Sequence, residues 1–273
     1  MSVKGFTERL RSVGRAALPP SVYQRIALGY DAVKGVRKMG WGEYHRFLGT
    51  ASGRNGQTSL ATFQIPPLLH PLTVRQGTTD ATAVTLSVIR ENYAQSFPSH
   101  PVRFIVDAGA YIGDTAAWYL STCPEATVVS LEPDEENFRL LDENCRPYGP
   151  RSIRKKAGVW PRDAFLRVDS TAEKDSVAVH EVEAGKPHDC LGLSLPRVME
   201  DAGFDQIDIL KCNIEGAEVP LFQSDFEPWL SRTRSIYIQL HNRTAVEAAM
   251  AAALKFGFKC RAYRTLHIFH RPD

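Results

Sequence analysis

The feature that most constrains the fold is the segment Phe104 to Leu120, FIVDAGAYIGDTAAWYL, where an apolar run passes into a helical run through two glycines and an acid. An apolar run without alternation is typical of a strand that is covered on both faces, as in a parallel sheet. Glycines at such a junction allow a tight turn and a close approach of the backbone to a ligand. The segment therefore predicts a strand, a turn and a helix at the ligand-binding edge of a parallel sheet.

Strands and helices alternate from Val102 onward. Further strands are expected in ATVVSLEP, SIRKKAGVW, IDILKCNI and RSIYIQLH, and helices over Asp114 to Ser121 and Asp134 to Cys145. WPRDAFLRV is expected to form a hairpin that turns at Pro161, Arg162 and Asp163. This order predicts an α/β fold with a mostly parallel sheet and helices on both faces. A helix leading into the first strand is expected in TTDATAVTLSVIRENY, capped by Thr79 or Asp80.

The N-terminal part is expected to be a basic helical extension over residues 1–60, followed by the main domain over residues 61–273. PPSVYQRIALGYDAVKGVRKMGW begins with the capping-box spacing of Ser21 and Gln24. Its apolar residues recur at helical spacing on one expected face: Val22, Ile26, Tyr30 and Val33. We expect this helix to end near Gly40 and the stretch GTASGRNGQTS to form a loop or hinge.

Charge and composition limit the classes of partner. The 33 basic and 31 acidic residues nearly cancel, so no nucleic-acid partner is expected, but the first 46 residues carry nine Lys or Arg against three Asp or Glu. We hypothesise that this basic segment contacts an anionic lipid surface or a partner enzyme. The alternative is a helix packed on the core with a solvated basic edge.

Location and metal content follow from what the sequence contains. It has neither a signal-peptide core nor a run of ~20 apolar residues, so a cytoplasmic protein is expected, peripheral at the membrane if the basic segment docks there. The five cysteines are scattered without a C-x-x-C pair, and the histidines show no ligand spacing. Neither a disulfide framework nor a metal site is expected.

Polar residues follow four of the expected strands. They are Asp107 and Gly109 after the first, Glu132 after the second, Asn213 and Glu215 after IDILKC, and His241 after SIYIQL. Because the carboxyl ends of parallel strands meet at one edge of a sheet, these residues predict a ligand site there.

The spacing Asp107-x-Gly109-x-x-x-Gly113 differs from the dinucleotide pattern G-x-G-x-x-G. A carboxylate at the first position would repel a phosphate and attract an ammonium group. Glu132, 19 residues after Gly113, is placed to accept the hydroxyls of a ribose. The ligand is then a nucleoside with a cationic amino-acid tail, which describes S-adenosylmethionine. The alternative is structural: Asp107 caps the helix, the glycines serve a turn, and Glu132 is a surface acid.

Three segments resemble the FkbM-type methyltransferases, a branch of the class I S-adenosylmethionine-dependent fold. They are VDAGAYIGDTAAWYL, VVSLEPDEENFRLLDENC and IDILKCNIEGAEVPLF, and the likeness extends to HPLTVRQGTTD and LHIFHRPD, covering about Leu69 to Asp273. The resemblance implies a Rossmann-like fold and O-methylation of sugar or polyketide hydroxyls. It also implies substrate contacts for Arg75 and Asp80, for which a surface charge and a helix cap are the alternatives.

The residues expected to hold the cofactor are Asp107, Gly109, Ala110, Tyr111, Gly113, Asp114, Glu132, Pro133 and Asn213. One position departs from the family, which usually has Asp where this chain has Asn213. An amide cannot take a proton, so any role of this position as a base, a metal ligand or a partner of the cofactor amine is weakened.

The catalytic residues expected are His241, Glu215 and Lys211. His241 is the leading general base because histidine titrates near neutral pH, and Glu215 is the reserve candidate. Lys211 lies inside an apolar strand and needs a partner, expected to be Glu215 or Glu218 at an acceptor pocket. The alternatives are a hydrogen-bonded strand-end histidine and a structural ion pair.

Three functions compete at this point. The first is an O-methyltransferase that uses S-adenosylmethionine and acts on a small-molecule or glycan acceptor. The second is a module that binds the cofactor without turnover, which Asn213 leaves open. The third, a nicotinamide-dependent oxidoreductase, is disfavoured because the first loop carries Asp107 and no G-x-G-x-x-G. A nucleobase methyltransferase is disfavoured because NIEG stands where an Asn-Pro-Pro-aromatic segment would be.

Overall fold

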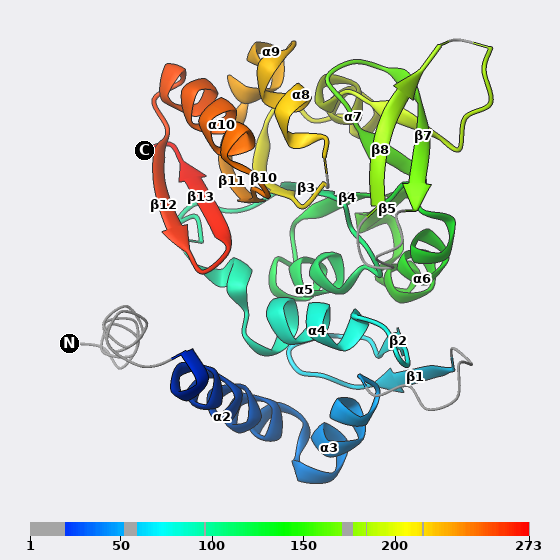
Figure 1. Ribbon diagram of the computed structural model, residues 1–273, viewed down its shortest axis with the longest axis vertical. Helices are drawn as coiled ribbons and strands as arrows, with labels where there is room; N and C mark the ends of the chain where they lie inside the picture. The colour runs from blue at the N-terminus through cyan, green and yellow to red at the C-terminus, as the bar shows by residue number, and fades with distance from the viewer. Residues whose placement is uncertain are drawn as a thin grey trace.

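The computed structural model describes residues 20–51, 59–95, 97–170, 177–183, 185–214 and 216–272, without the side chains of residues 20–27, 169–170 and 177–178. A seven-stranded sheet forms its centre, in the order β12-β13-β11-β10-β3-β4-β5 (Figure 1). These strands are β12 (Lys259–Tyr263), β13 (Leu266–His270), β11 (Thr233–Gln239), β10 (Ile207–Cys212), β3 (Phe104–Ala108), β4 (Thr127–Leu131) and β5 (Ser152–Lys155). The five strands from β11 to β5 are parallel, and β13 is antiparallel to both of its neighbours. The predicted α/β fold with a mostly parallel sheet is confirmed.

Helices cover both faces of the sheet, which explains the unbroken apolar runs. One layer contains α5 (Asp114–Thr122) and α6 (Glu135–Cys145), and the other contains α7 (Leu195–Ala202), α8 (Glu218–Gln223), α9 (Glu227–Leu230) and α10 (Arg243–Lys255) (Figure 1). Successive residues of β3 enter the two cores in turn: Phe104 and Val106 belong to one, Ile105 to the other. A strand buried in this way has no solvent face, so it needs no polar alternation.

A second sheet of four strands departs from the sequence prediction. Its order is β6-β9-β7-β8, with β6 (Ala157–Val159), β9 (Cys190–Leu193), β7 (Ala164–Ser170) and β8 (Val177–Val182). SIRKKAGVW is therefore not one strand, because β5 lies in the central sheet and β6 in this one.

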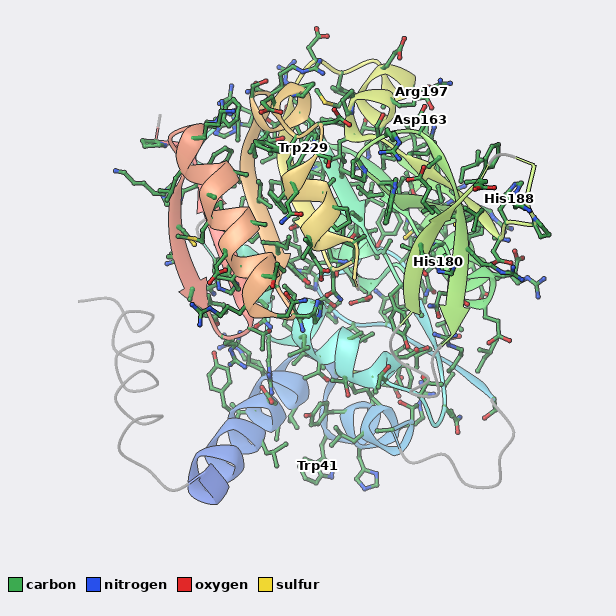
Figure 2. The ribbon with its side chains drawn as sticks, turned by 45° about the horizontal axis from the view of Figure 1, so that its top comes forward. Trp41, Asp163, His180, His188, Arg197 and Trp229 are labelled. Atoms are coloured by element: carbon green, nitrogen blue, oxygen red, sulfur yellow. The ribbon has the colours of Figure 1, made fainter. Side chains whose placement is uncertain are left out.

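The hairpin predicted in WPRDAFLRV is wrong. β6 and β7 are not paired, since β9 lies between them and pairs with both. The bend between them is held by a residue distant in the sequence: Asp163 (Figure 2) accepts hydrogen bonds from the backbone N–H and the hydroxyl of Ser194, just after β9. A long-range partner thus replaces the local hydrogen bonds on which the hairpin prediction depended.

The N-terminal elements pack beside α5. They comprise α2 (Pro20–Met39), α3 (Trp41–Gly49), β1 (Leu60–Phe63), β2 (Leu72–Arg75), α4 (Asp80–Val84) and the single turns η1 (Thr85–Ile89) and η2 (Asn92–Ala94); η3 (Arg146–Arg151) follows α6. The helix starting after Thr79 and the end of α2 at Met39 agree with the predictions. Residues 52–58 of the predicted hinge lie outside the described residues, and a domain boundary near residue 60 stays a prediction.

The face of α2 that packs on the domain differs from the predicted one. Val33 is 69% exposed, whereas Asp31 and Gly35 are buried. The physical reason is that Asp31 forms an ion pair with Arg90, while a Cβ at Gly35 would lie 2.1 Å from the ring of Tyr44, so α3 packs directly on the glycine. Val22, Ile26 and the capping-box side chains lie outside the described set. Among the described residues, no helix has the length and apolar character needed to cross a membrane.

Candidate active site

A cavity of about 300 Å³ opens at the carboxyl edge of the central sheet. Six of the nine predicted cofactor residues line it: Gly109, Tyr111, Asp114, Glu132, Pro133 and Asn213. Lys211 lines it as well, whereas Asp107, Ala110 and Gly113 are not among the lining residues. The structure therefore brings the ends of β3, β4 and β10 together around one cavity, as the topology of a parallel sheet requires.

Gly109 makes a cradle that no other residue type could form. Its φ is +70°, and a Cβ there would lie 2.0 Å from the carbonyl oxygen of Asn213. The turn is held by the backbone N–H of Gly109, which donates to Leu131 O at 3.0 Å. Beside it, the side-chain Oδ1 of Asn213 is buried and has no hydrogen-bond partner within the described part of the chain. An orphaned acceptor next to a glycine cradle indicates a ligand that carries a hydrogen-bond donor.

Glu132 is a buried carboxylate at the end of β4. It accepts hydrogen bonds from the backbone N–H groups of Tyr111 at 2.8 Å and Asp134 at 3.1 Å. Burial raises the pKa of Glu132 to about 7, and these hydrogen bonds offset only part of the rise. The surface-acid alternative is wrong, because Glu132 is 5% exposed and lines the cavity.

Lys211 pairs with Asp107, which the sequence did not predict. Its Nζ lies 2.9 Å from Asp107 Oδ1 and donates to Gly109 O at 2.5 Å. Burial raises the pKa of Asp107, and the ammonium group lowers that rise. For Lys211, burial lowers the pKa, but attraction to Asp107 outweighs it, so the pKa is raised and the pair is ionic. Asp107 is thus neutralised by this chain itself, and the expected pairing of Lys211 with Glu218 is wrong.

Asp114 supplies a second titratable carboxyl in the cavity. It is the first residue of α5, and the hydroxyl of Ser87 donates to its Oδ2. Burial raises the pKa of Asp114 to about 6, while the hydrogen bond from Ser87 acts in the opposite direction. Asp114 therefore changes charge close to neutral pH.

His241 lies just after β11. It contacts Glu218, which the sequence analysis had expected to pair with Lys211. Its Nδ1 lies 2.5 Å from Oε1 of Glu218, whose side chain is 1% exposed. A carboxylate at Nδ1 favours the tautomer that carries the hydrogen on that nitrogen. His241 itself is not among the cavity-lining residues, but Gln239, two residues before it, is. The reserve base Glu215 lies outside the described residues.

Arg75 and Asp80 support the cofactor loop from behind. The Arg75 guanidinium donates to both carboxylate oxygens of Asp80, at 3.1 and 2.9 Å, and to Asn137 Oδ1 at 2.8 Å. The hydroxyl of Tyr111 donates to Asp80 at 2.6 Å, and Tyr111 has the unusual φ of +52°. Neither Arg75 nor Asp80 lines the cavity. This network holds Tyr111 where its backbone N–H reaches Glu132. The positions of Arg75 and Asp80 in the sequence did not indicate this supporting role.

The segment that carries these strand ends matches the sequence model of a known family. The family model described as "Methyltransferase FkbM domain" matches residues 107–260, more than half of the chain. The chain belongs to the FkbM methyltransferase family. It is therefore a methyltransferase that uses S-adenosylmethionine, which confirms the predicted family, enzyme class and cofactor.

Relatives of this FkbM methyltransferase share limited identity. Methyltransferase sdnD of Sordaria araneosa is 23% identical over 193 residues, covering 59% of this chain and 74% of that protein. AMB antimetabolite synthetase AmbE of Pseudomonas aeruginosa is 23% identical over 195 residues, covering 56% of this chain but only 9% of that protein. Precorrin-6y C5,15-methyltransferase from Geobacter metallireducens GS-15 has a TM-score of 0.42 and 8% identity, covering 67% of this chain and 88% of that one.

The residues of the FkbM site fit S-adenosylmethionine chemically. Glu132 would offer a carboxylate to the two ribose hydroxyls, Gly109 would leave room for the ligand against the backbone, and Asn213 would offer an unused carbonyl oxygen to the ammonium group. When bound, S-adenosylmethionine supplies an electrophilic methyl group on a sulfonium. The buried Lys211 and Asp107 pair fixes the floor on which Gly109 rests.

The remaining lining of the cavity is neutral. On one side it is formed by Thr79 just before α4, by Thr82 and Leu86 of α4 and η1, by Val179 of β8 and by Gln239 at the end of β11. Among the lining residues in the described part of the chain there is no arginine, and the one lysine, Lys211, is already paired. This part of the wall presents hydroxyl, amide and apolar groups.

Proposed function

We propose that this FkbM methyltransferase O-methylates an uncharged hydroxyl of a sugar, a glycan or a polyketide-type natural product. The observation that carries the proposal is the neutral wall formed by Thr79, Thr82 and Gln239 beside the cofactor residues. Hydroxyl and amide side chains both donate to and accept from hydroxyl groups. Phosphate or carboxylate acceptors would instead call for arginine or a free lysine at the cavity.

The names of the relatives support a small-molecule acceptor. One matching protein is an antimetabolite synthetase, a name that describes the making of a small molecule, although this chain matches only 9% of its length. The near balance of basic and acidic residues supports the same reading, because nucleic acids select an excess of basic charge.

The chain's own residues would then act in three ways. Thr79, Thr82 and Gln239 orient the acceptor hydroxyl, and the buried walls exclude water, so that positioning lowers much of the barrier. His241, two residues beyond the lining residue Gln239, is the proposed general base: the acceptor hydroxyl would have to reach past Gln239 to meet it, and the proton would then pass to solvent from its partly exposed ring. Glu218, buried beside Nδ1, orients the imidazole and stabilises the imidazolium that results.

A location in the cytoplasm belongs to the same proposal. The five cysteines, Cys123, Cys145, Cys190, Cys212 and Cys260, are all free thiols, as is usual for proteins of a reducing compartment. Fractionation of the source cells would test this, and recovery of the protein in an oxidising compartment would contradict it.

The acceptor class is tested with isotope-labelled S-adenosylmethionine and an extract of the source cells. The full-length protein is added to the extract, and the products that gain label are identified by mass. The expected product is a sugar, a glycan or a polyketide-type small molecule that gains one methyl group. Label found only in protein or nucleic acid would contradict the proposal. The Gly109→Ala variant is the matched control, because it should transfer no label.

A further inference from the structure

Two acids line the cavity, and their surroundings differ. Asp114 and Glu132 are the residues with a carboxyl group among those that line it in the described part of the chain. The charge that acts on the pKa of Glu132 is that of Asp134, just after it. The charges that act on the pKa of Asp114 are those of Lys211 and Asp107, on β10 and β3. Since β3 lies between β10 and β4, Asp114 and Glu132 serve different parts of the cavity.

The acid that the sequence offered to an ammonium group is already neutralised. Asp107 is fully buried, is not among the lining residues, and lies 2.9 Å from Lys211 Nζ. The two opposite charges cancel, so the pair presents no net charge to a ligand. A cationic group in the cavity therefore needs another counter-ion.

Asp114 is a buried carboxyl group that the chain leaves without a cation. Its side chain accepts a hydrogen bond from the neutral hydroxyl of Ser87, and no ion pair joins it to a basic side chain within the described residues. Lys211, the cation that acts on it, is held by Asp107. An ionised carboxylate is costly to bury without a partner. A ligand that brings a positive charge to Asp114 would remove this cost.

A second acceptor for such a ligand lies beside the turn at Gly109. Asn213 Oδ1 is buried and has no hydrogen-bond partner in the part of the chain that the structure describes. An ammonium group has three N–H donors, so a carboxylate and an amide oxygen can accept from it together. The carboxylate of an amino-acid tail can be met by neutral donors, because Tyr93 and Thr115 line the same cavity with hydroxyl groups.

We propose that Asp114 is the counter-ion of the ammonium group of S-adenosylmethionine, with Asn213 Oδ1 as a second acceptor, while Glu132 takes the ribose hydroxyls. The sequence assigned the attraction of the ammonium group to Asp107, and the ion pair with Lys211 transfers that role to Asp114. The proposal concerns the cofactor alone. Its test contains no acceptor, so its failure would leave the proposed O-methylation standing.

The test compares two ligands by isothermal titration with the full-length protein at pH 8, where Asp114, with a pKa of about 6, is ionised. One ligand is S-adenosylhomocysteine, and the other is its deaminated analogue, in which hydrogen replaces the amino group. Neither carries a sulfonium, so the amine is the cation that distinguishes them. The wild type should bind S-adenosylhomocysteine at least about tenfold more tightly, the scale of a hydrogen bond to a charged group. Asp114→Asn should lose this preference by weakening the binding of S-adenosylhomocysteine alone.

Glu132→Gln is the matched control. It should weaken both ligands by the same factor and keep the wild-type preference, because both ligands contain the ribose.

The stability of the ligand-free protein separates a binding role of Asp114 from a structural one. Asparagine keeps an acceptor for the Ser87 hydroxyl and removes an unpaired buried charge, so Asp114→Asn should be at least as stable as the wild type in urea at pH 8. A structural role predicts lower stability and an equal loss of affinity for both ligands. That result would overturn the proposal, as would a wild type that shows no preference or an Asp114→Asn variant that keeps it.

Discussion

Replacing Glu132 by glutamine should weaken S-adenosylmethionine binding and remove its pH dependence. Glutamine keeps the size of the side chain and one oxygen for the hydrogen bond from Tyr111, but it loses the charge. Hydrogen bonds to a charged group contribute about 1.5–3 kcal/mol. The dissociation constant should therefore rise about 10- to 160-fold, since 1.36 kcal/mol is a factor of ten.

The pH dependence follows from the burial of this carboxyl, which raises its pKa to about 7. Below that pH Glu132 is protonated and offers less to the ribose hydroxyls; above it the carboxylate is available. Wild-type affinity should thus increase about tenfold from one pH unit below the pKa to one above it. Isothermal titration of the wild type and Glu132→Gln across this range measures both effects. Asp114→Asn is the control, because Asp114 titrates nearby with a pKa of about 6.

The same pKa makes an opposite prediction for the stability of the ligand-free protein. The folded-state pKa is raised above the ordinary 4.5, so the folded protein holds a proton that the unfolded chain loses between pH 4.5 and about 7. This contribution is present below pH 4.5 and lost as the pH rises to about 7, at a total of about 3 kcal/mol. Glu132→Gln should therefore be more stable than the wild type above pH 7, as measured by urea unfolding. A variant that binds normally, or that is less stable above pH 7, would refute the reasoning.

Three further outcomes are expected. His241→Ala should lower kcat by ~10²–10⁴-fold with little change in cofactor affinity, and the pH–rate profile should lose its ascending limb; an unchanged kcat would move the base elsewhere. Gly109→Ala should abolish cofactor binding, because its Cβ overlaps Asn213 O, while Gly149→Ala, with a similar φ and open space around it, should bind normally. Lys211→Met should lower the free energy of unfolding by about 3–5 kcal/mol, because it leaves Asp107 unpaired. The double variant Lys211→Met/Asp107→Asn should be less destabilised. Urea unfolding measures both, and the same stability as the wild type for both variants would contradict this.

The strands of the central sheet that are buried on both faces could be predicted from the sequence. β3, β4, β10 and β11 are largely buried and mostly apolar, so their composition identified them, and the parallel order then brought Gly109, Glu132 and Asn213 to one cavity. The positions of these residues at strand ends follow from topology and needed no knowledge of side-chain contacts.

Contacts between residues far apart in the chain could not be predicted from the sequence. Lys211 is paired with Asp107, its neighbour across β10 and β3, and a buried lysine does not reveal which of several nearby acids will meet it. Glu218 likewise contacts His241, 23 positions away. The insertion of β9 between β6 and β7 defeated the hairpin prediction in the same way, because strand order is decided by partners distant in the chain.

We propose that a methyl group is transferred to a hydroxyl in the cavity beside Glu132 and Gly109. The most direct measurement is a carbon NMR spectrum of the acceptor after incubation with purified protein and S-adenosylmethionine labelled with carbon-13 in the methyl group. We expect a single labelled methyl bonded to oxygen with the wild type and none with Gly109→Ala. A labelled methyl bonded to nitrogen or carbon, or equal labelling by the Gly109→Ala protein, would contradict it.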